Sequence, residues 1–450
     1  MSDSIFGTDG IRGRYGDGWL TLSGAEQVGF AAGQVLRTRS ESSAHALLAH
    51  DGRASGPELE RALARGLAAA GVRATSAGLI PTPALAWLAR HHDFAFGLMV
   101  SASHNPAQDN GIKVFGGAGE KPDDATQAAI EDILRSGETK VDAGAELAHA
   151  PELIDAYAGH LLEDFAAGLD LSNLKIVLDC ANGAGSVLGP RVLEGLGAQL
   201  IARAAAPDGV NINEGCGSTK PEGLQADVVA HGADIGIALD GDGDRCILVD
   251  ANGDIVHGDG ILTVLGRHAA STGTASSRNV VATVMSNRGL HRALRDVGVG
   301  VVEVAVGDRA VVEGMRHGGL ALGGEQSGHV VLGERNDHIG DGLATGLAVL
   351  GVMHATGESL RALAAPYQPF PQILINVPVG SKPAFETIEG LLEHVAQVER
   401  DLGDEGRVLL RYSGTENLAR VMVEGPDADT IQRFADALAD RFRSVLGSGA

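Results

Sequence analysis

The chain of 450 residues is poor in aromatic residues and in positive charge, and each shortage excludes a class of protein. Aromatic residues make up 4% of the sequence against 44% for all hydrophobic types, so we expect aliphatic cores. Lysine and arginine number 35 against 58 acidic residues, and the net charge of −23 argues against nucleic acid or an anionic membrane as a partner. An anionic substrate would therefore need a local basic pocket.

Signals for membrane insertion or export are missing as well. The sequence has no run of about 18 apolar residues that would span a bilayer. Its first residues, Met-Ser-Asp-Ser, lack the basic and apolar regions of a secretory signal. The three cysteines, Cys180, Cys216 and Cys246, show no CxxC spacing, which predicts reduced thiols. We therefore expect a cytoplasmic protein.

Apolar runs typical of strands alternate along the chain with segments of helical spacing. This pattern predicts parallel or mixed sheets covered on both faces, with ligand loops at the carboxyl ends of strands. The expected strands are 46–49, 95–100, 175–179, 235–240, 280–284 and 320–322. The expected helices are 57–70, 125–135, 154–165, 190–196 and 291–297. Three prolines within residues 366–371 predict a rigid linker, and strands are expected to outnumber helices beyond it.

Asp240, Asp242 and Asp244 form the most informative motif, because they follow an apolar run at alternating positions separated by glycines. Clustered carboxylates offer the hard oxygen ligands that Mg²⁺ prefers, and without a cation they repel one another. Arg245 adds a planar donor fork for a phosphate oxygen. An EF-hand is excluded, because Arg245 occupies the loop position where that motif requires glycine. An acidic surface turn between two strands stays open as the alternative.

Ser103 and His104 follow the expected strand 95–100 and precede Asn105 and Pro106. A hydrolase nucleophile is disfavoured, because the chain has no G-x-S-x-G elbow and a histidine adjacent in sequence is not expected to face the serine oxygen. A second interpretation is that Ser103 carries a transferable phosphoryl group, which would complete the coordination of the metal. An ordinary Ser/Asn/Pro turn is the third.

Two further polar loops suit a phosphorylated sugar. Glu325 and Ser327 lie two residues apart, so in extended backbone both would point to one side and could bind vicinal hydroxyls. His329, in the same loop, is expected to be structural. Residues 408–423 place two arginines, hydroxyls and small residues between apolar runs, which is the composition of a phosphate cradle. A polar hairpin turn is the alternative for this last segment.

These segments, together with FGTDGIRG at residues 6–13, resemble the α-D-phosphohexomutase superfamily in their order and spacing. The motifs are SASHNP, DGDGDR, GEQSGH and RYSGTEN, and the resemblance covers essentially the whole chain. It implies an α/β protein with a heart-shaped, four-domain architecture: three α/β units with mixed sheets and a smaller C-terminal α+β domain. We place the domains, with their phosphoserine, metal, sugar-binding and phosphate-binding loops, at 1–152, 153–255, 256–367 and 368–450.

The resemblance also implies residue roles. Ser103 would carry the phosphoryl group, and one Mg²⁺ per chain would be held by Ser103, Asp240, Asp242 and Asp244. The other catalytic candidates are Arg12, His104, Lys113 and Arg245, with the general base open between His104 and Lys113. The sugar's 3- and 4-hydroxyls would bind to Glu325 and Ser327. The phosphate that is not reacting would bind to Arg411, Ser413, Gly414, Thr415 and Arg420.

Within the superfamily, the opening motif and residues 209–218, 306–309 and 323–329 are similar to one branch. Its members interconvert glucosamine 6-phosphate and glucosamine 1-phosphate through a phosphoserine and a 1,6-bisphosphate, and they supply UDP-N-acetylglucosamine for cell-wall synthesis. The resemblance implies a hexose 1,6-bisphosphate as activator, a sugar phosphate as partner, a homodimer, and a C-terminal domain that closes over the sugar. The alternatives are a phosphomannomutase/phosphoglucomutase with the same mechanism, a non-catalytic sugar-phosphate-binding protein, and a metal-dependent phosphohydrolase.

Overall fold

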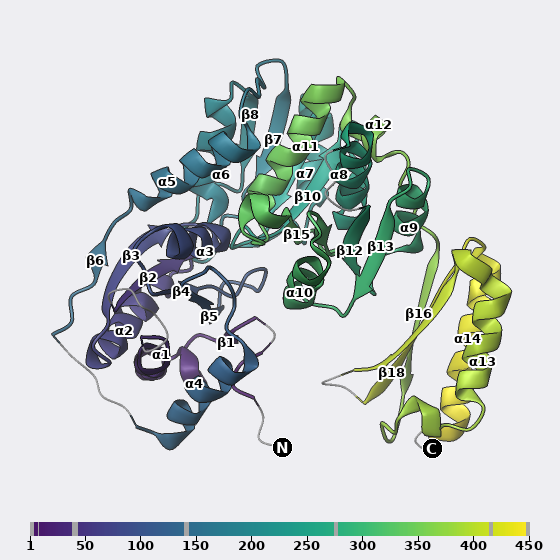
Figure 1. The fold of residues 1–450 in the computed structure, drawn as a ribbon, viewed down its shortest axis with the longest axis horizontal. Coiled ribbons are helices and arrows are strands. Elements are labelled where there is room, and N and C mark those ends of the chain that lie inside the picture. The colour runs from purple at the N-terminus through teal and green to yellow at the C-terminus, as the bar shows by residue number, and fades with distance from the viewer. Residues whose placement is uncertain are drawn as a thin grey trace. The chain divides into compact units, whose positions relative to one another are not determined.

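Four β-sheets carry the architecture of the part of the chain that the structure describes (Figure 1). The computed structural model describes residues 4–7, 9–37, 44–138, 144–273, 278–413 and 417–446. Within these ranges the sheets follow one another along the sequence, and no strand of one sheet lies between two strands of another. None of the helices in the same ranges is long and apolar enough to cross a membrane.

The first sheet has six strands in the order β1-β5-β4-β2-β3-β6. They are β1 (Ile11–Arg14), β2 (His45–His50), β3 (Arg73–Leu79), β4 (Phe96–Val100), β5 (Asp109–Gly116) and β6 (Ala148–His149). The sheet is mixed, because β2 pairs in parallel with β3 and β4 while β5 pairs antiparallel with β4 and β1. Its helices are α1 (Leu22–Leu36), α2 (Gly56–Ala69), α3 (Thr82–His91) and α4 (Asp124–Ser136). The strands expected at 46–49 and 95–100 and the helices expected at 57–70 and 125–135 are confirmed.

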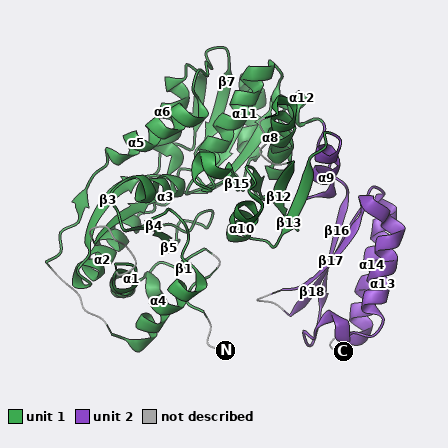
Figure 2. Cartoon of the chain, in the orientation of Figure 1, with its two compact units in different colours: residues 1–285, 297–365 green, residues 286–296, 366–450 purple. Residues whose placement is uncertain are grey.

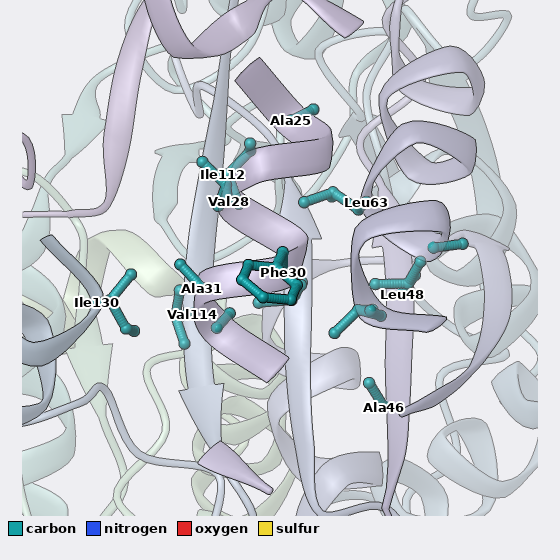
Figure 3. Close-up of a cluster of buried hydrophobic side chains, with 14 of the residues drawn as sticks. Ala25, Val28, Phe30, Ala31, Ala46, Leu48, Leu63, Ile112, Val114 and Ile130 are labelled. Carbon is teal, nitrogen blue, oxygen red and sulfur yellow. The ribbon is translucent and has the colours of Figure 1, made fainter. Parts of the chain in front are cut away.

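Helices α1 and α2 pack so closely that glycine is required at their crossing. A Cβ atom on Gly29 would lie 2.3 Å from the carbonyl oxygen of Leu63, and one on Gly66 would lie 1.9 Å from that of Glu26. The neighbouring Phe30 is 2% exposed, and Figure 3 shows it in a core built from these helices, the sheet and α4. Burying a side chain of this kind stabilises the fold by roughly 1.5–3 kcal/mol. This packing supports β4 and β5, whose connecting loop carries Ser103.

The second sheet has the order β11-β10-β9-β7-β8. Its strands are β7 (Lys175–Asp179), β8 (Gln199–Arg203), β9 (Ile235–Leu239), β10 (Cys246–Asp250) and β11 (Ile255–Val256). The accompanying helices are α5 (Leu153–His160), which continues into a π-helical turn at Leu161–Phe165, α6 (Gly185–Gly195) and α7 (Glu222–His231). The strands expected at 175–179 and 235–240 are confirmed. The sequence did not predict β10, which pairs antiparallel with β9 directly after the acidic loop.

The third sheet has the order β13-β12-β14-β15. Its strands are β12 (Asn279–Thr283), β13 (Gly300–Val304), β14 (Gly323–Gly324) and β15 (Val330–Val331), and its helices are α8 (Gly258–Thr272), α10 (Asp308–Gly318), α11 (Gly342–Thr356) and α12 (Leu360–Ala364). The strand expected at 320–322 is wrong, because pairing begins at Gly323. Leu320 instead packs with Val311 and Met315, so the apolar run reflects side-chain burial and not strand pairing.

The chain divides into two compact units, formed by residues 1–285 with 297–365 and by residues 286–296 with 366–450 (Figure 2). The second unit contains a sheet of order β16-β18-β17. Its elements are α9 (Arg288–Arg295), β16 (Gln372–Pro378), α13 (Leu391–Leu402), β17 (Arg407–Tyr412), β18 (Leu418–Glu424) and α14 (Ala428–Leu446). Helix α9, expected at 291–297, begins and ends a few residues earlier and belongs with this unit although it lies between β12 and β13 in sequence.

Candidate active site

Ser103 lies in the loop between β4 and β5, and its side chain is directed at the acidic cluster. The residue is 1% exposed and has a φ of 50°, a left-handed conformation that is uncommon for a residue with a side chain. Its Oγ donates to Oδ2 of Asp240 at 2.6 Å. The structure therefore brings the candidate phosphate carrier together with a candidate metal ligand that follows it by more than one hundred residues.

The acidic loop connects β9 to β10 and is buried. Asp240, Asp242 and Asp244 are 0%, 0% and 8% exposed, and their ligand oxygens lie within 4.8 Å of one another. The loop is a turn between antiparallel strands, but the alternative of a surface turn is wrong because its three carboxylates face inward. Gly243 has a φ of 77°, which lets the backbone turn between two of the carboxylates.

The three carboxylates fit a hard divalent cation. Burial and the charges of Asp244 and Asp242 raise the pKa of Asp240 above its ordinary range. Oδ1 of Asp242 and Oδ1 of Asp244 are buried without a hydrogen-bond partner among the described residues. Buried unpaired oxygens cost free energy, and a metal ion that accepts oxygen ligands would satisfy them.

Lys113, on β5, neutralises part of this negative charge. Its Nζ lies 2.7 Å from Oδ2 of Asp242, 2.9 Å from Oδ2 of Asp9 and 3.6 Å from Oδ2 of Asp244. Burial alone would lower the pKa of Lys113, but the three carboxylates outweigh it and raise the pKa well above the ordinary value. The ammonium group is therefore a source of positive charge beside the carboxylates.

His104 faces the serine oxygen, which corrects the expectation that it would not. Its Nδ1 lies 3.3 Å from Oγ of Ser103, and the positive φ of Ser103 is what turns the two side chains toward each other. Burial, together with the charges of Arg245 and Arg12, lowers the pKa of His104. The imidazole is therefore neutral at pH 7 and can accept a proton.

The two arginines expected at the site approach it from different elements. Arg245 follows the acidic loop, and its main-chain N–H donates to Oδ1 of Asp240 at 3.1 Å while its Nε lies 3.8 Å from Oδ1 of Asp244. Arg12 lies on β1 and forms an ion pair with Asp9, the carboxylate that also contacts Lys113. Asp9 thus links Arg12 to the lysine beside the cluster.

Glu325 and Ser327 lie close together, although the extended backbone expected for them is wrong. Residues 325–328 form a turn closed by a hydrogen bond of 3.0 Å from Gly328 N to the carbonyl oxygen of Glu325. The Ser327 Oγ and Glu325 Oε2 atoms are nevertheless 3.5 Å apart. Glu325 also accepts from the main-chain N–H of Gly307 at 3.0 Å, so the segment 306–309 meets the loop that was expected to bind the sugar.

His329, expected to be structural, is buried next to the acidic cluster. Its Nδ1 lies 3.8 Å from Oδ1 of Asp244. Burial lowers its pKa, but the contact with Asp244 outweighs burial and the net effect raises the pKa. Nothing in the sequence pointed to this contact beyond the place of His329 in the GEQSGH motif.

A cavity of about 440 Å³ opens beside the cluster within the first unit. Its lining includes groups of both signs, among them Lys113, Lys121, Asp244, Asp308 and His329. Lys121 forms ion pairs with Asp9 and with Asp308, which connects the N-terminal turn to the start of α10. The sequence did not single out Lys121, because nothing local distinguishes it from a surface lysine.

The expected phosphate cradle lies in the second unit. Arg411 on β17 and Arg420 on β18 are direct cross-strand partners, and they point away from the core because Leu410 and Ala419 point into it. Like charges directly opposite each other destabilise a sheet, and a bound anion would offset this. Ser413 accepts at its carbonyl oxygen from Nζ of Lys382 at 2.6 Å, which adds a third cation. The expected Gly414 and Thr415 lie outside the described residues.

Sequence profiles of the phosphoglucomutase/phosphomannomutase family match four segments of the chain. The profiles of alpha/beta/alpha domains I, II and III match residues 3–141, 155–253 and 257–370, and that of the C-terminal domain matches residues 374–441. Fold and site thus define a phosphohexomutase with three α/β domains and a smaller C-terminal domain.

Proteins similar to this chain belong to this class and indicate one branch of it. The phosphoglucosamine mutase of Rhodococcus erythropolis is 48% identical over 446 residues, covering 98% of this chain and 99% of the relative. That of Mycobacterium marinum is 46% identical over 440 residues, covering 97% and 98%. The chain therefore belongs to the phosphoglucosamine mutases of the α-D-phosphohexomutase superfamily.

Solved structures share the fold over the full length. A phosphoglucomutase/phosphomannomutase family protein of Burkholderia thailandensis matches with a TM-score of 0.81 and 26% identity, covering 99% of this chain and 98% of that one. The N-acetylphosphoglucosamine mutase of Aspergillus fumigatus, solved with GlcNAc-6P and magnesium, matches with a TM-score of 0.68 and 18% identity, covering 98% and 95%. At 18% identity, the match to the Aspergillus fumigatus enzyme shows only that the two proteins share a fold.

Proposed function

We propose that the protein interconverts glucosamine 6-phosphate and glucosamine 1-phosphate through phosphorylated Ser103. The observation that carries this proposal is the Ser103 hydroxyl, buried and 2.6 Å from Asp240 within the three-carboxylate cluster. A buried serine against a cluster of this charge is suited to hold a phosphoryl group next to a divalent cation. Identity of 46–48% to phosphoglucosamine mutases over nearly the whole chain supports glucosamine phosphate as the substrate.

The first half-reaction transfers the phosphoryl group from Ser103 to the sugar. The bond from phosphorus to Oγ of Ser103 breaks and a bond to O1 of glucosamine 6-phosphate forms, which gives glucosamine 1,6-bisphosphate. His104, neutral at pH 7, accepts the proton of the attacking hydroxyl. Arg12, Lys113 and Arg245 stabilise the charge on the transferring group.

The second half-reaction returns the 6-phosphate to Ser103 after the bisphosphate has turned over. Glu325 and Ser327 bind the 3- and 4-hydroxyls, which lie between the two phosphate positions and so suit both orientations. Arg411, Ser413, Gly414, Thr415 and Arg420 bind the phosphate that is not reacting. A hexose 1,6-bisphosphate rephosphorylates Ser103 whenever the intermediate escapes.

One Mg²⁺ is proposed to bind Asp240, Asp242, Asp244 and an oxygen on Ser103, where it would supply positive charge against the transferring phosphoryl group. The proposed supply of UDP-N-acetylglucosamine for cell-wall synthesis follows from the same reaction. The homodimer and the cytoplasmic location stay predictions, and sedimentation and cell fractionation would test them.

Turnover tests the proposal most directly. Glucosamine, glucose and mannose 6-phosphates are each incubated with the protein, Mg²⁺ and a trace of the matching hexose 1,6-bisphosphate, and the 1-phosphates are measured. We expect a clear preference for glucosamine 6-phosphate. Preference for a neutral hexose would keep the mechanism and reject the substrate, and steady release of inorganic phosphate would indicate a hydrolase. No isomerisation with fully phosphorylated Ser103 would leave only a binding protein.

A further inference from the structure

Arg53, which follows β2, is a buried guanidinium whose five N–H groups are all used. It is 1% exposed, and its Nε donates to Oδ2 of Asp51 at 2.9 Å. Its Nη1 and Nη2 donate to four main-chain carbonyl oxygens, those of Ser103, Asn105 and Pro106 in the loop after β4 and that of Asp109 at the start of β5. The segment therefore wraps around one side chain, which comes from the loop after the neighbouring strand β2.

Asn213, which lies between β8 and α7, binds the same loop. Its Nδ2 donates to the carbonyl oxygen of Ser103 at 2.9 Å and to that of Asn105 at 3.1 Å. The same two carbonyls accept from Nη2 of Arg53 at 3.0 and 2.9 Å. Each carbonyl is therefore bridged between a residue of the first sheet's loops and a residue of the segment 209–218.

The loop that carries the three aspartates packs closely against the Ser103 carbonyl and Asn213. A Cβ atom on Gly241 would lie 2.5 Å from the carbonyl oxygen of Ser103 and 2.7 Å from Nδ2 of Asn213. Gly241 separates Asp240 from Asp242, so the clamped carbonyl packs closely against the backbone of the loop that carries the acidic cluster. Any shift of the serine loop is then a shift relative to the metal ligands.

The backbone of Ser103 needs such support. A left-handed φ in a residue other than glycine costs of order 1–3 kcal/mol and persists only where the surroundings over-determine it. With its carbonyl held by Arg53 and Asn213 and its N–H donating to Oγ of Ser101 at 2.9 Å, Ser103 is fixed on both sides of its Cα. Its side chain is thereby directed at Asp240.

We propose that Arg53 and Asn213 are positioning residues for phosphoryl transfer, which clamp the backbone of Ser103 so that its Oγ stays aligned with the acidic cluster. The inference rests on the proposed function. It assigns a role to the segment 209–218, which the mechanism otherwise leaves unused. Since both residues bind the main-chain carbonyl oxygen of Ser103, they act through the backbone, and their loss should affect the rate of transfer more than the binding of substrate.

The test uses two variants of different severity and a matched control. Arg53→Lys keeps the charge but supplies three donors in place of five, and Asn213→Ala removes two hydrogen bonds at a less buried position. Arg65→Lys, on α2, is the control, because Arg65 is paired with Glu26 on α1 and is not part of the site. For each protein we would measure kcat, KM, thermal unfolding, and hydrogen exchange of the amides in residues 103–109.

Displacement of a reacting group by about 1 Å costs on the order of 100-fold in rate, so we expect kcat to fall about 100-fold in Arg53→Lys and about tenfold in Asn213→Ala. We expect KM to stay within about twofold in both, because the groups that bind substrate are intact. Exchange of the 103–109 amides should be faster in both variants and unchanged in the control.

A wild-type kcat in Asn213→Ala would overturn the proposal, as would a fall in kcat that only matches the fraction of unfolded protein. If Arg53→Lys fails to fold, Asn213→Ala still decides the question. Wild-type protein without isomerase activity would reject the proposed function instead. The clamp would then be tested by the rate at which glucose 1,6-bisphosphate phosphorylates Ser103, read by intact mass, and equal rates in wild type and Asn213→Ala would reject it.

Discussion

The hydroxyl oxygen of Ser103 lies 2.6 Å from Oδ2 of Asp240, although the two residues follow strands of different sheets. The contact joins two loops that lie 137 residues apart in the sequence and meet only in the tertiary structure. The contact distinguishes the two serines of the SASHNP motif. Ser103 donates to the acidic cluster, whereas Ser101 donates to Asp51.

Replacement of Ser103 by alanine is expected to abolish turnover. Without Oγ there is no acceptor for the phosphoryl group, and loss of a nucleophile lowers kcat by at least about 1,000-fold. Formation of glucosamine 1-phosphate measures the effect, and intact mass should show no added phosphate. The control is Ser172→Ala, at an exposed loop position. Substantial activity in Ser103→Ala would reject the phosphoserine role.

Asp242→Asn is expected to weaken Mg²⁺ binding and so to raise the Mg²⁺ concentration needed for half-maximal rate. Changes even to groups that only support metal ligands cost about 10- to 100-fold in affinity, so loss of a carboxylate ligand should cost at least about tenfold. A Mg²⁺ titration of kcat and calorimetric binding would measure it. Asp254→Asn, which alters an exposed carboxylate paired with Arg361, is the control. An unchanged Mg²⁺ requirement would mean that the ion binds elsewhere.

Arg420→Ala is expected to raise KM without destabilising the second unit. A hydrogen bond to a charged group is worth about 1.5–3 kcal/mol, which predicts an increase in KM of roughly 10- to 100-fold. Arg411 and Arg420 are direct cross-strand partners of like charge, so removing the charge of Arg420 relieves one unfavourable contact, and the unfolding temperature without phosphate should change little. Inorganic phosphate should stabilise the wild type more than the variant. The control is Arg443→Ala on α14, and an unaltered KM in Arg420→Ala would remove the residue from the cradle.

The pH dependence of kcat should reveal His104 as the base. Its pKa is lowered by burial and by the charges of Arg245 and Arg12, so the neutral form persists to a lower pH than for an isolated imidazole. Activity should therefore be lost on acidification below the ordinary value of 6.5. His104→Gln should lower kcat by about 100-fold or more and remove this acidic limb. His149→Gln, at an exposed position, is the control. An identical limb in His104→Gln would assign the ionisation to another group.

Glu60 predicts a pH dependence of stability that is separate from the active site. Its carboxyl group is 2% exposed and accepts from Oγ of Ser76, and burial raises its pKa from 4.5 to about 8. The unfolded chain releases this proton near pH 4.5, so the stabilisation is complete below that pH and is lost as the pH rises to about 8.

The free energy of unfolding should fall by up to about 1.4 kcal/mol per pH unit within this window. Glu60→Gln should remove that slope in urea unfolding at pH 5, 6.5 and 8, whereas the exposed Glu152→Gln should keep it. Equal slopes in the wild type and in Glu60→Gln would show that other groups set the dependence.

The sequence predicted those parts of the site whose residues lie together within one short stretch of chain. The spacing of Asp240, Asp242 and Asp244 after an apolar run predicted a cluster of oxygen ligands, although it left open whether the loop was a surface turn. Ser103 was identified by its place after a strand and by the resemblance of its motif. The expected strand 320–322 failed because apolar residues in a short loop can be buried by packing against a helix.

The groups that the sequence did not predict reach the site through tertiary contacts. Lys121 and Asp308 are separated by many residues, and only the fold places them in contact with each other and with Asp9. The role of Arg53 could not be predicted for a different reason. Its acceptors are main-chain carbonyl oxygens, which every residue has, so no residue type in the sequence indicates these hydrogen bonds. The contact between His104 and Ser103 depends on a backbone angle that residue types alone do not specify.

Helix α9 makes the second unit discontinuous in the chain, and this limits how that unit can be separated from the rest. The buried carboxylate of Glu424 accepts from the main-chain N–H of Arg288, and Asn287 exchanges hydrogen bonds with the main chain of Phe370. Cleavage within 366–371 would release β16 to α14 without α9, and each orphaned buried group costs about 1–3 kcal/mol. Truncations, fusions or domain grafts that keep this unit stable must therefore carry residues 286–296 with it.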